Sequence, residues 1–352
     1  MKIAQIAPVW ERVPPAKYGG IELVVHLLTE ELVDRGHDVT LFASGNSKTE
    51  AELVSVYARE QRGLIGRAAP DLLHVASALL KAARFDIVHN HAGYSGVSLA
   101  NFVETPVLST LHGIFTPTNT PLFQAFAHSC YYNSISDEQR RSGPVLNYAG
   151  TVYNAIDVDS FPFSREKKDY VFLVSRMTRL KGIHVAIRVA KKAGVKLVLA
   201  GKIDPGADRV YFEEKVRPFL DHEHVVFLHE VSEGRKRKLL RDARAFLFPL
   251  QWSEPFGLVM VEAMACGTPV ISFPKGAVPE VVVHGKTGFL AETEDEMVGF
   301  VQRIGDINPE DCRRHVEKRF SVSRMVDDYE RLYARILEQR STEEGAGELA
   351  EN

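Results

Sequence analysis

The chain has 352 residues, of which 45% are hydrophobic and 25% are charged, and its formal net charge is −3. This composition is ordinary for a folded globular protein, and the length predicts two domains of roughly 150–200 residues each. The small net charge gives no reason to expect a polyanionic partner such as nucleic acid. The three cysteines (Cys130, Cys266 and Cys312) have a wide, irregular spacing that is not typical of a disulfide framework or a zinc site, so we expect a reducing, cytoplasmic location.

No stretch approaches the roughly 18 apolar residues that a membrane-spanning helix requires. Near the N-terminus, Glu11 and Arg12 interrupt the apolar run before it reaches the length of a signal peptide. The basic run at 234–244 (GRKRKLLRDAR) could contact an anionic membrane surface. Such a run is more often the solvated face of a helix, which is the interpretation we favour.

In the first half of the chain, short apolar runs alternate with amphipathic stretches. The segment 21–37 carries apolar residues at helical spacing and ends near Gly36, a natural helix stop. Strands are predicted at 2–8, 38–44, 86–91, 106–112, 130–136 and 151–156. This βαβ alternation predicts a largely parallel sheet that is covered on both faces.

A polar, charged segment at 162–169 (PFSREKKD) has no periodicity and is predicted to be a linker. The alternation then restarts, with a helix at 182–194 and strands at 170–176, 196–201, 225–230, 245–250 and 269–274. We therefore expect an α/β fold with two doubly wound, Rossmann-like domains, at 1–162 and 170–320, that face each other. A long helix at 321–340 and a frayed acidic tail at 341–352 complete the prediction.

Ligands of open parallel sheets bind beyond the carboxyl ends of the strands, so the strand-to-helix loops are the candidate sites. The first of these loops places Gly19 and Gly20 at the start of a helix, where free backbone N–H groups and the helix dipole can receive a phosphate. A structural tight turn is the alternative interpretation. The chain contains neither the GxGxxG dinucleotide fingerprint at this point nor a GxxxxGK[ST] phosphate loop.

The corresponding loop of the second half reads VSRMTRLKGIHVA and carries Arg176 and Lys181 just before a predicted helix. Two cations at the carboxyl end of a strand suit a diphosphate, because arginine grips oxygens in a fork and lysine adds a point charge. An ordinary solvated loop would also tolerate both residues.

The stretch SEPFGLVMVEAMACGTPV places Glu254 before a predicted helix at about 255–265 and Glu262 inside it, among apolar neighbours. A buried carboxylate is costly unless it is hydrogen-bonded, and the two hydroxyls of a vicinal diol would satisfy it. The backbone N–H groups of Phe256, Gly257, Leu258 and Val259 open the helix and would bind phosphate oxygens. A sugar diphosphate meets these needs together, whereas a pair of structural acids is the alternative.

This last stretch resembles the E-x7-E motif of retaining glycosyltransferases of family 4 (glycosyl transferases group 1). Further motifs of that family follow in the same order along the chain, from about residue 2 to residue 330. They are the stretches YGGIELVVHLLTEELVDRGHDVTLFAS, VYNAIDVDSF, VSRMTRLKGI and GAVPEVVVHGKTGFL. The resemblance implies the GT-B fold, in which two doubly wound domains face each other across a cleft and the C-terminal helix crosses back to the N-terminal domain.

The resemblance also implies roles for individual residues. Glu262 would hold the ribose diol of the donor, Glu254 would contact hydroxyls of the transferred sugar, and Arg176 with Lys181 would neutralise the departing diphosphate. The 256–259 amides and Gly19–Gly20 would complete the phosphate and sugar cradle. In the first domain, His112 matches a histidine that reaches the transferred sugar; without the family it is one of several strand-end histidines, beside His89 and His91. Val231 would border the nucleobase.

These roles predict a retaining hexosyltransferase that uses a nucleoside diphosphate sugar and a hydroxyl acceptor (a sugar, a lipid-linked sugar or a small molecule). UDP-glucose is the default donor, ahead of GDP-mannose and ADP-glucose, and the family implies front-face transfer. The D-x-D sequence at 157–159 is interpreted as structural, so no metal and no cofactor are expected. A nucleotide-sugar epimerase and a non-catalytic sugar-nucleotide binding protein are the alternatives.

Overall fold

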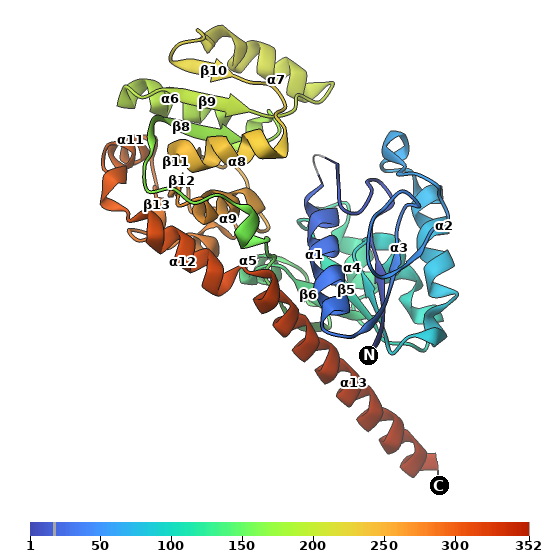
Figure 1. The fold of residues 1–352 in the computed structure, drawn as a ribbon. Helices are drawn as coiled ribbons and strands as arrows, with labels where there is room; N and C mark the ends of the chain where they lie inside the picture. Colours follow the sequence, from blue (N-terminus) through green and yellow to red (C-terminus); the bar gives the residue numbers. More distant parts are fainter. Residues whose placement is uncertain (17–18, 352) are drawn as a thin grey trace. The chain divides into compact units, whose positions relative to one another are not determined.

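The computed structural model describes residues 1–16 and 19–351, with side chains through residue 342, and divides the chain into two units (Figure 1). Unit 1 comprises Met1–Ala155 and Val322–Asn352, and unit 2 comprises Ile156–Ser321. Each unit is built on one parallel β-sheet with helices in the connections between strands. The predicted pair of doubly wound α/β units is confirmed.

The sheet of unit 1 has seven strands in the order β3-β2-β1-β4-β5-β6-β7, all paired in parallel. The strands are β1 (Lys2–Ile6), β2 (Asp38–Phe42), β3 (Glu52–Val54), β4 (Ile87–Asn90), β5 (Val107–Leu111), β6 (Tyr131–Ser134) and β7 (Tyr148–Thr151). The helices are α1 (Gly20–Asp34), α2 (Ala68–Leu79), α3 (Tyr94–Leu99), α4 (Thr120–Ala125), α5 (Asp137–Ser142) and α13 (Val322–Glu351). The strand order reverses between β1 and β4, where ligands bind in sheets of this kind.

The sheet of unit 2 has six parallel strands in the order β10-β9-β8-β11-β12-β13. The strands are β8 (Lys168–Val174), β9 (Leu197–Ala200), β10 (Val225–Phe227), β11 (Ala243–Phe248), β12 (Val270–Ser272) and β13 (Gly288–Leu290). The helices are α6 (Ile183–Ala193), α7 (Ala207–Lys215), α8 (Glu233–Asp242), α9 (Leu258–Ala265), α10 (Val278–Val281), α11 (Glu294–Gln302) and α12 (Pro309–Arg319). Here the order reverses between β8 and β11.

Central strands such as β4, β5 and β9 are buried along their whole lengths, as expected for a sheet covered on both faces. The edge strands β3 and β13 were not predicted, because three residues are too few to show a periodicity. A strand was predicted at 151–156, but the strand of the structure is β7, which lies earlier and ends at Thr151. The apolar residues after Thr151 lead the chain out of unit 1.

The chain enters unit 2 at Ile156, so the boundary predicted at 162 and the linker predicted at 162–169 differ from the structure. Ile156 forms a bridge with Ser321, which places the entry and exit points of unit 2 side by side. Within the expected linker, the partly buried Lys167 ammonium donates to the carbonyl oxygens of Arg241 and Cys266, at 2.8 and 3.1 Å. These bonds, which a charge pattern does not reveal, fasten the segment to unit 2.

The terminal helix α13 belongs to unit 1, as the resemblance implied, and it packs against α1 and β7. Arg35, at the end of α1, donates to Asp327 and Glu330 of α13 at 2.6 and 2.7 Å. The helix continues to Glu351, whereas a frayed tail was predicted from residue 341. The strong helix formers of that stretch, mainly alanine and glutamate, outweigh its two glycines.

Candidate functional site

The two strands at the reversal point of unit 2 lead into the loops that carry the predicted charges. Arg176 and Lys181 follow β8, and Glu254 follows β11. The loops are joined by a hydrogen bond from the Gln251 amide to the Leu180 carbonyl, at 2.8 Å. Gly182 permits this approach, because it has a φ of 71° and a Cβ there would lie 1.9 Å from the carbonyl oxygen of Pro249.

Lys181 and Glu254 meet directly in this pair of loops. The Lys181 ammonium donates to the Glu254 carboxylate, and the side chains are only 14% and 12% exposed. The Trp252 indole donates to the same carboxylate oxygen at 3.1 Å, and its ring lies 5.0 Å from the Lys181 ammonium. A cation and a carboxylate are therefore held together in fixed positions. Trp252 was not singled out from the sequence, although it lies two residues before Glu254.

Arg176 is not bonded to this pair and is 45% exposed. Its guanidinium lies 3.9 Å from the carboxylate of Asp204, in the loop after β9, and that carboxylate is also 2.7 Å from the Lys202 ammonium. Lys202 is a further cation that the sequence analysis did not identify. The neighbouring strands β8 and β9 thus present two exposed cations at their carboxyl ends, which suits an anionic ligand.

Glu262 is buried, as predicted, and its structural partner is Lys236 of α8. The ammonium lies 3.0 and 2.9 Å from the two carboxylate oxygens and also 3.0 Å from Glu233. Burial alone would lower the pKa of Lys236, but the two carboxylates outweigh it and hold that pKa above its ordinary value. Lys236 therefore stays charged. We had predicted that the run 234–244 is a solvated face, and Lys236 differs from that prediction because it is largely buried.

Helix α9 begins at Leu258, later than the predicted start near 255. Gly257 precedes it in the left-handed conformation, with a φ of 86°, so the helix cannot extend further back. The side chain of Phe256 is buried against Phe320, with ring centroids 5.6 Å apart. The helix-opening amides are consequently those of Leu258 and Val259, rather than the whole 256–259 set. Val231 lies in the loop before α8, partly exposed.

In unit 1, Gly19 and Gly20 open α1 after the loop that follows β1. A Cβ on Gly19 would lie 2.6 Å from the Cβ of Pro15 and 3.0 Å from a carboxylate oxygen of Glu22, so only glycine fits this turn. Glu22 is 6% exposed, and burial raises its pKa to about 7. This buried acid, three residues after Gly19, was missed because its surroundings come from distant residues such as Glu11.

The raised pKa of Glu22 predicts a stability that depends on pH. Its carboxyl binds a proton more tightly in the folded state than in the unfolded state, where the pKa is near 4.5, so stability falls as pH rises from about 4.5 to 7. The loss amounts to at most about 3 kcal/mol. In urea unfolding, Glu22→Gln should equal the wild type near pH 4.5 and exceed it at pH 8. Asp34→Asn, at the exposed end of α1, controls for charge; a wild type equally stable at both pH values contradicts the prediction.

His112 immediately follows β5 and is partly exposed. Its Nε2 atom lies 2.9 Å from Nδ1 of His91, which follows the neighbouring strand β4. Burial lowers the pKa of His112 to about 4, so the ring is neutral near pH 7. Gly19, Gly20 and His112 thus all lie at the carboxyl-end side of the sheet of unit 1, while the other predicted site residues belong to unit 2.

The D-x-D sequence lies on a short 3₁₀ turn at the start of unit 2. The side chain of Asp159 is 99% exposed and is held 3.3 Å from Arg313. Among the residues that the structure describes, no three His, Cys, Asp or Glu side chains form a cluster that could hold a metal ion. The structural interpretation of this sequence stays a prediction.

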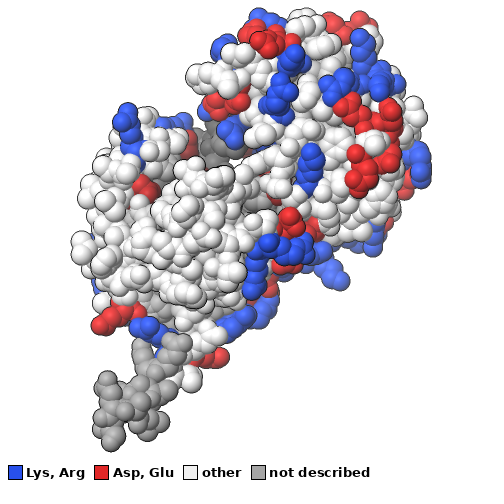
Figure 2. Space-filling model, turned by 180° about the vertical axis from the view of Figure 1, so that it is seen from behind, with Lys and Arg blue, Asp and Glu red and all other residues white. Residues whose placement is uncertain are grey.

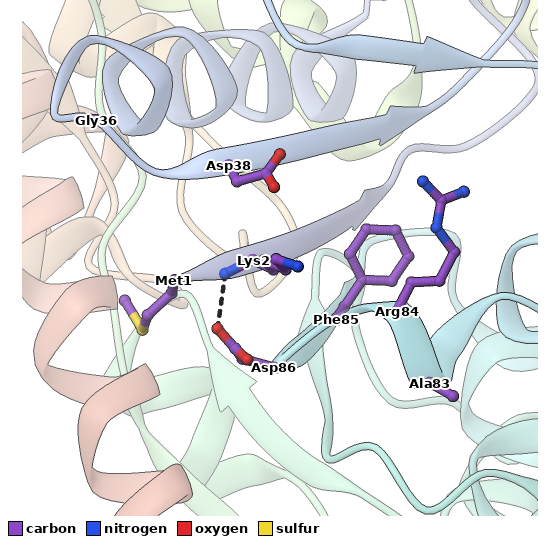
Figure 3. Close-up of a pocket in the computed structure, with 8 residues that line it drawn as sticks. All are labelled: Met1, Lys2, Gly36, Asp38, Ala83, Arg84, Phe85 and Asp86. Carbon is purple, nitrogen blue, oxygen red and sulfur yellow. Dashed lines mark hydrogen bonds between the residues drawn. The ribbon is translucent and has the colours of Figure 1, made fainter.

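A pocket of about 480 Å³ opens in unit 1 at the amino-terminal ends of the strands, opposite the ends where the candidate site residues lie (Figure 3). It lies where β1, β2 and β4 begin, and the Lys2 amide donates to Asp86 at 2.7 Å across it. Its lining residues are Met1, Lys2, Gly36, Asp38, Ala83, Arg84, Phe85 and Asp86. Because parallel sheets bind ligands at the other end of their strands, we do not assign the chemistry to this pocket.

Over the described range, no helix combines the length and apolar character needed to cross a membrane. On the face of the molecule in Figure 2, basic and acidic side chains are interspersed wherever charges gather. Within the basic run of α8, Arg237 stacks on Phe161 at 4.7 Å and donates to the carbonyl of Ser160. Part of the basic run therefore makes contacts with other residues of unit 2.

Comparison with known proteins gives similar sequences and folds over nearly the whole chain. A phosphatidyl-myo-inositol mannosyltransferase of Mycolicibacterium smegmatis is 26% identical, over 99% of this chain and 95% of its own length. Sucrose-phosphate synthase of Thermosynechococcus elongatus has a similar fold, with a TM-score of 0.79, 20% identity and coverage of 96% and 100%. Anabaena Alr3699/HepE in complex with UDP-glucose matches with a TM-score of 0.70, 19% identity and coverage of 95% and 100%.

Two family models match successive parts of the chain. The model described as Glycosyltransferase Family 4 matches residues 18–158, and the model described as Glycosyl transferases group 1 matches residues 157–315. Together they span the glycine loop of unit 1 and the charged loops of unit 2. The chain therefore belongs to glycosyltransferase family 4 and has the GT-B fold.

Proposed function

We propose that this glycosyltransferase moves a hexose from a nucleoside diphosphate sugar to a hydroxyl acceptor, with retention at the anomeric carbon and without a metal. The observation that carries the proposal is the loop pair at the reversal point of unit 2. There the Lys181–Glu254 pair and the exposed Arg176 supply both a counter-charge for a diphosphate and an acceptor for sugar hydroxyls. The family match supports the transferase class.

In the proposed reaction, the bond between the anomeric carbon and the diphosphate breaks while a bond to the acceptor oxygen forms on the same face of the sugar. The acceptor's proton passes to an oxygen of the departing phosphate. Arg176 and Lys181 stabilise the charge that grows on the diphosphate, which is the dominant contribution in such sites. The amides of Leu258 and Val259 add hydrogen bonds to its oxygens.

The other predicted residues bind and orient the donor. Glu262 accepts from the ribose diol, and the Lys236 ammonium, 2.9 and 3.0 Å from its two oxygens, holds that carboxylate in place. Glu254 accepts from hydroxyls of the transferred sugar, and Val231 borders the base. From unit 1, Gly19–Gly20 and His112 contribute to the phosphate and sugar contacts, as the family resemblance implies.

UDP-glucose is the donor we propose. The complex of Anabaena Alr3699/HepE with UDP-glucose supports this choice, whereas the mannosyltransferase relative favours a mannose donor, and GDP-mannose is therefore the next candidate. The acceptor that we propose is a hydroxyl-bearing sugar, lipid-linked sugar or small molecule. The three buried, free cysteines fit the reducing cytoplasm that we propose as its location.

The proposal is tested by thermal unfolding with UDP, GDP and ADP and their sugars, with EDTA present. A ligand at 100 times its dissociation constant should stabilise the fold by about 2.7 kcal/mol, which raises the midpoint measurably. We expect a shift with UDP and UDP-glucose that EDTA leaves unchanged. A shift with another nucleotide alone would replace the donor, one that needs a divalent metal would refute the metal-free site, and none at all would refute the assignment.

A further inference from the structure

His112 is the partly exposed end of a series of hydrogen bonds inside unit 1. Its Nε2 atom lies 2.9 Å from Nδ1 of His91, whose Nε2 lies 3.0 Å from the side-chain oxygen of Gln5. The Gln5 amide donates to the Tyr333 hydroxyl at 3.2 Å, and that hydroxyl lies 2.7 Å from Nδ1 of His89. We call these five residues the histidine network.

The rest of the histidine network is shielded from water. Gln5, His89 and Tyr333 are 0% exposed and His91 is 2% exposed, so His112 is its contact with the exterior. The network spans three adjacent strands and α13, and it is anchored further by a 2.7 Å bond from Nε2 of His89 to the hydroxyl of Thr110. A buried set of polar groups that is bonded throughout fixes the orientation of its members.

The donors and acceptors in the histidine network determine where the imidazole protons lie. The Gln5 amide donates to Tyr333, so its oxygen faces His91 and can only accept; Nε2 of His91 therefore carries a hydrogen. Burial lowers the pKa of His91 well below its ordinary value, with smaller contributions from His89 and His112, so the ring is neutral. A neutral imidazole has one N–H, which leaves Nδ1 of His91 as an acceptor.

His112 must then supply the proton in the 2.9 Å bond between the two rings. Since His112 is also neutral near pH 7, its single hydrogen is on Nε2 and its Nδ1 atom carries a lone pair. With the described residues, Nδ1 of His112 forms no hydrogen bond, so this lone pair is available to a ligand.

We propose that His91 is a positioning residue for the transfer reaction, which fixes His112 in the Nε2–H tautomer so that its Nδ1 atom accepts a hydrogen bond from a hydroxyl of the transferred sugar. This inference deepens the proposed function and rests on it for the identity of the ligand. In the opposite tautomer, Nδ1 of His112 would carry the hydrogen and would donate it to an oxygen atom of the sugar instead. Gln5 and Tyr333 act through His91, because their hydrogen bonds determine which of its nitrogens carries the proton.

The tautomer of His112 is measured in the whole protein without a ligand, by ¹⁵N NMR with ring-labelled histidine. The signals of His112 are assigned by their loss in His112→Gln. We expect Nε2–H in the wild type, a mixture of tautomers in His91→Phe, which has no acceptor, and Nε2–H again in His91→Gln, whose side-chain oxygen can accept. An Nδ1–H tautomer in the wild type, or an Nε2–H tautomer unchanged in His91→Phe, overturns the proposal.

The consequence for the sugar is measured as the ratio of the dissociation constants of UDP and UDP-glucose. Loss of one well-oriented hydrogen bond should reduce the contribution of the glucose group by about threefold to tenfold in His91→Phe, while UDP binding stays unchanged. His91→Gln should restore most of the ratio. Equal ratios in all three proteins refute the role in sugar binding.

A matched control is His74→Phe, because His74 is buried in the same unit and, among the described residues, bonds the carbonyl of Ala7, at 2.9 Å, and no member of the histidine network. It should lower stability but change neither the tautomer of His112 nor the ratio. If His91→Phe fails to fold, the wild type and His91→Gln still decide the tautomer. If UDP-glucose does not bind, the donor is refuted while the NMR result still upholds or overturns the role of His91.

Discussion

Replacing Lys181 with alanine should lower kcat by about 10²- to 10³-fold, the usual cost of removing one preorganised donor to a developing charge. The structure gives this residue a second role, because its ammonium is bonded to the Glu254 carboxylate and lies over the Trp252 ring. The alanine variant therefore also leaves Glu254 without its cation. We expect Arg176→Ala to lower kcat by a comparable factor, with less effect on the loop because that side chain is 45% exposed.

The measurement is steady-state transfer from the donor found by thermal unfolding, with the unfolding midpoint of each variant as the folding check. Arg179→Ala is the matched control, since Arg179 lies in the same loop but its guanidinium sits 5.8 Å over the Tyr211 ring. It should keep nearly full activity. A double variant of Arg176 and Lys181 that retained wild-type turnover would refute the assignment of the diphosphate site.

Replacing Glu262 with glutamine should weaken donor binding by about 10- to 100-fold, because a hydrogen bond to a charged group contributes about 1.5–3 kcal/mol. It should also lower the free energy of unfolding, by up to about 3 kcal/mol, because the largely buried Lys236 ammonium loses one of its two carboxylate partners. Calorimetric titration with the nucleotide and urea unfolding measure the two effects separately.

The two effects of Glu262→Gln are separated by a second change, Lys236→Met. In the double variant no unpaired ammonium remains, so stability should largely recover while donor binding stays weak. Glu233→Gln removes the other, more exposed partner of Lys236 and should leave donor binding nearly unchanged. If donor affinity returned together with stability in the double variant, Glu262 would be a structural acid and not the ribose ligand.

The sequence predicted the fold class because its strands and helices alternate with clear periodicity and buried strands are continuous apolar runs. It also placed Lys181, Glu254 and Glu262 correctly at strand ends and in a helix, since local order along the chain determines that much. The start of α9 was misplaced because the sequence does not reveal that Gly257 adopts the left-handed conformation, with a φ of 86°, just before the helix.

Contacts between distant residues could not be predicted from one sequence. The bond between Lys236 and Glu262 joins two helices across 26 positions, and nothing in the basic run distinguishes Lys236 from its exposed neighbours. Likewise, His91 was one of several strand-end histidines until Gln5 and Tyr333 were found behind it. Such pairs depend on how the sheet and the helices pack, and the local sequence pattern does not reveal that packing.

The membership of α13 in unit 1 has a consequence for the order in which the protein forms during synthesis. The ribosome completes the whole of unit 2 before Tyr329 and Tyr333 have been added, so a nascent unit 1 lacks the hydroxyls that satisfy Gln5, His89 and Asn133. Unit 2, which is contiguous in sequence, can fold first. Unit 1 lacks α13 until residues 322 onward have been made, and premature termination after residue 321 would remove the tyrosine partners of Gln5, His89 and Asn133.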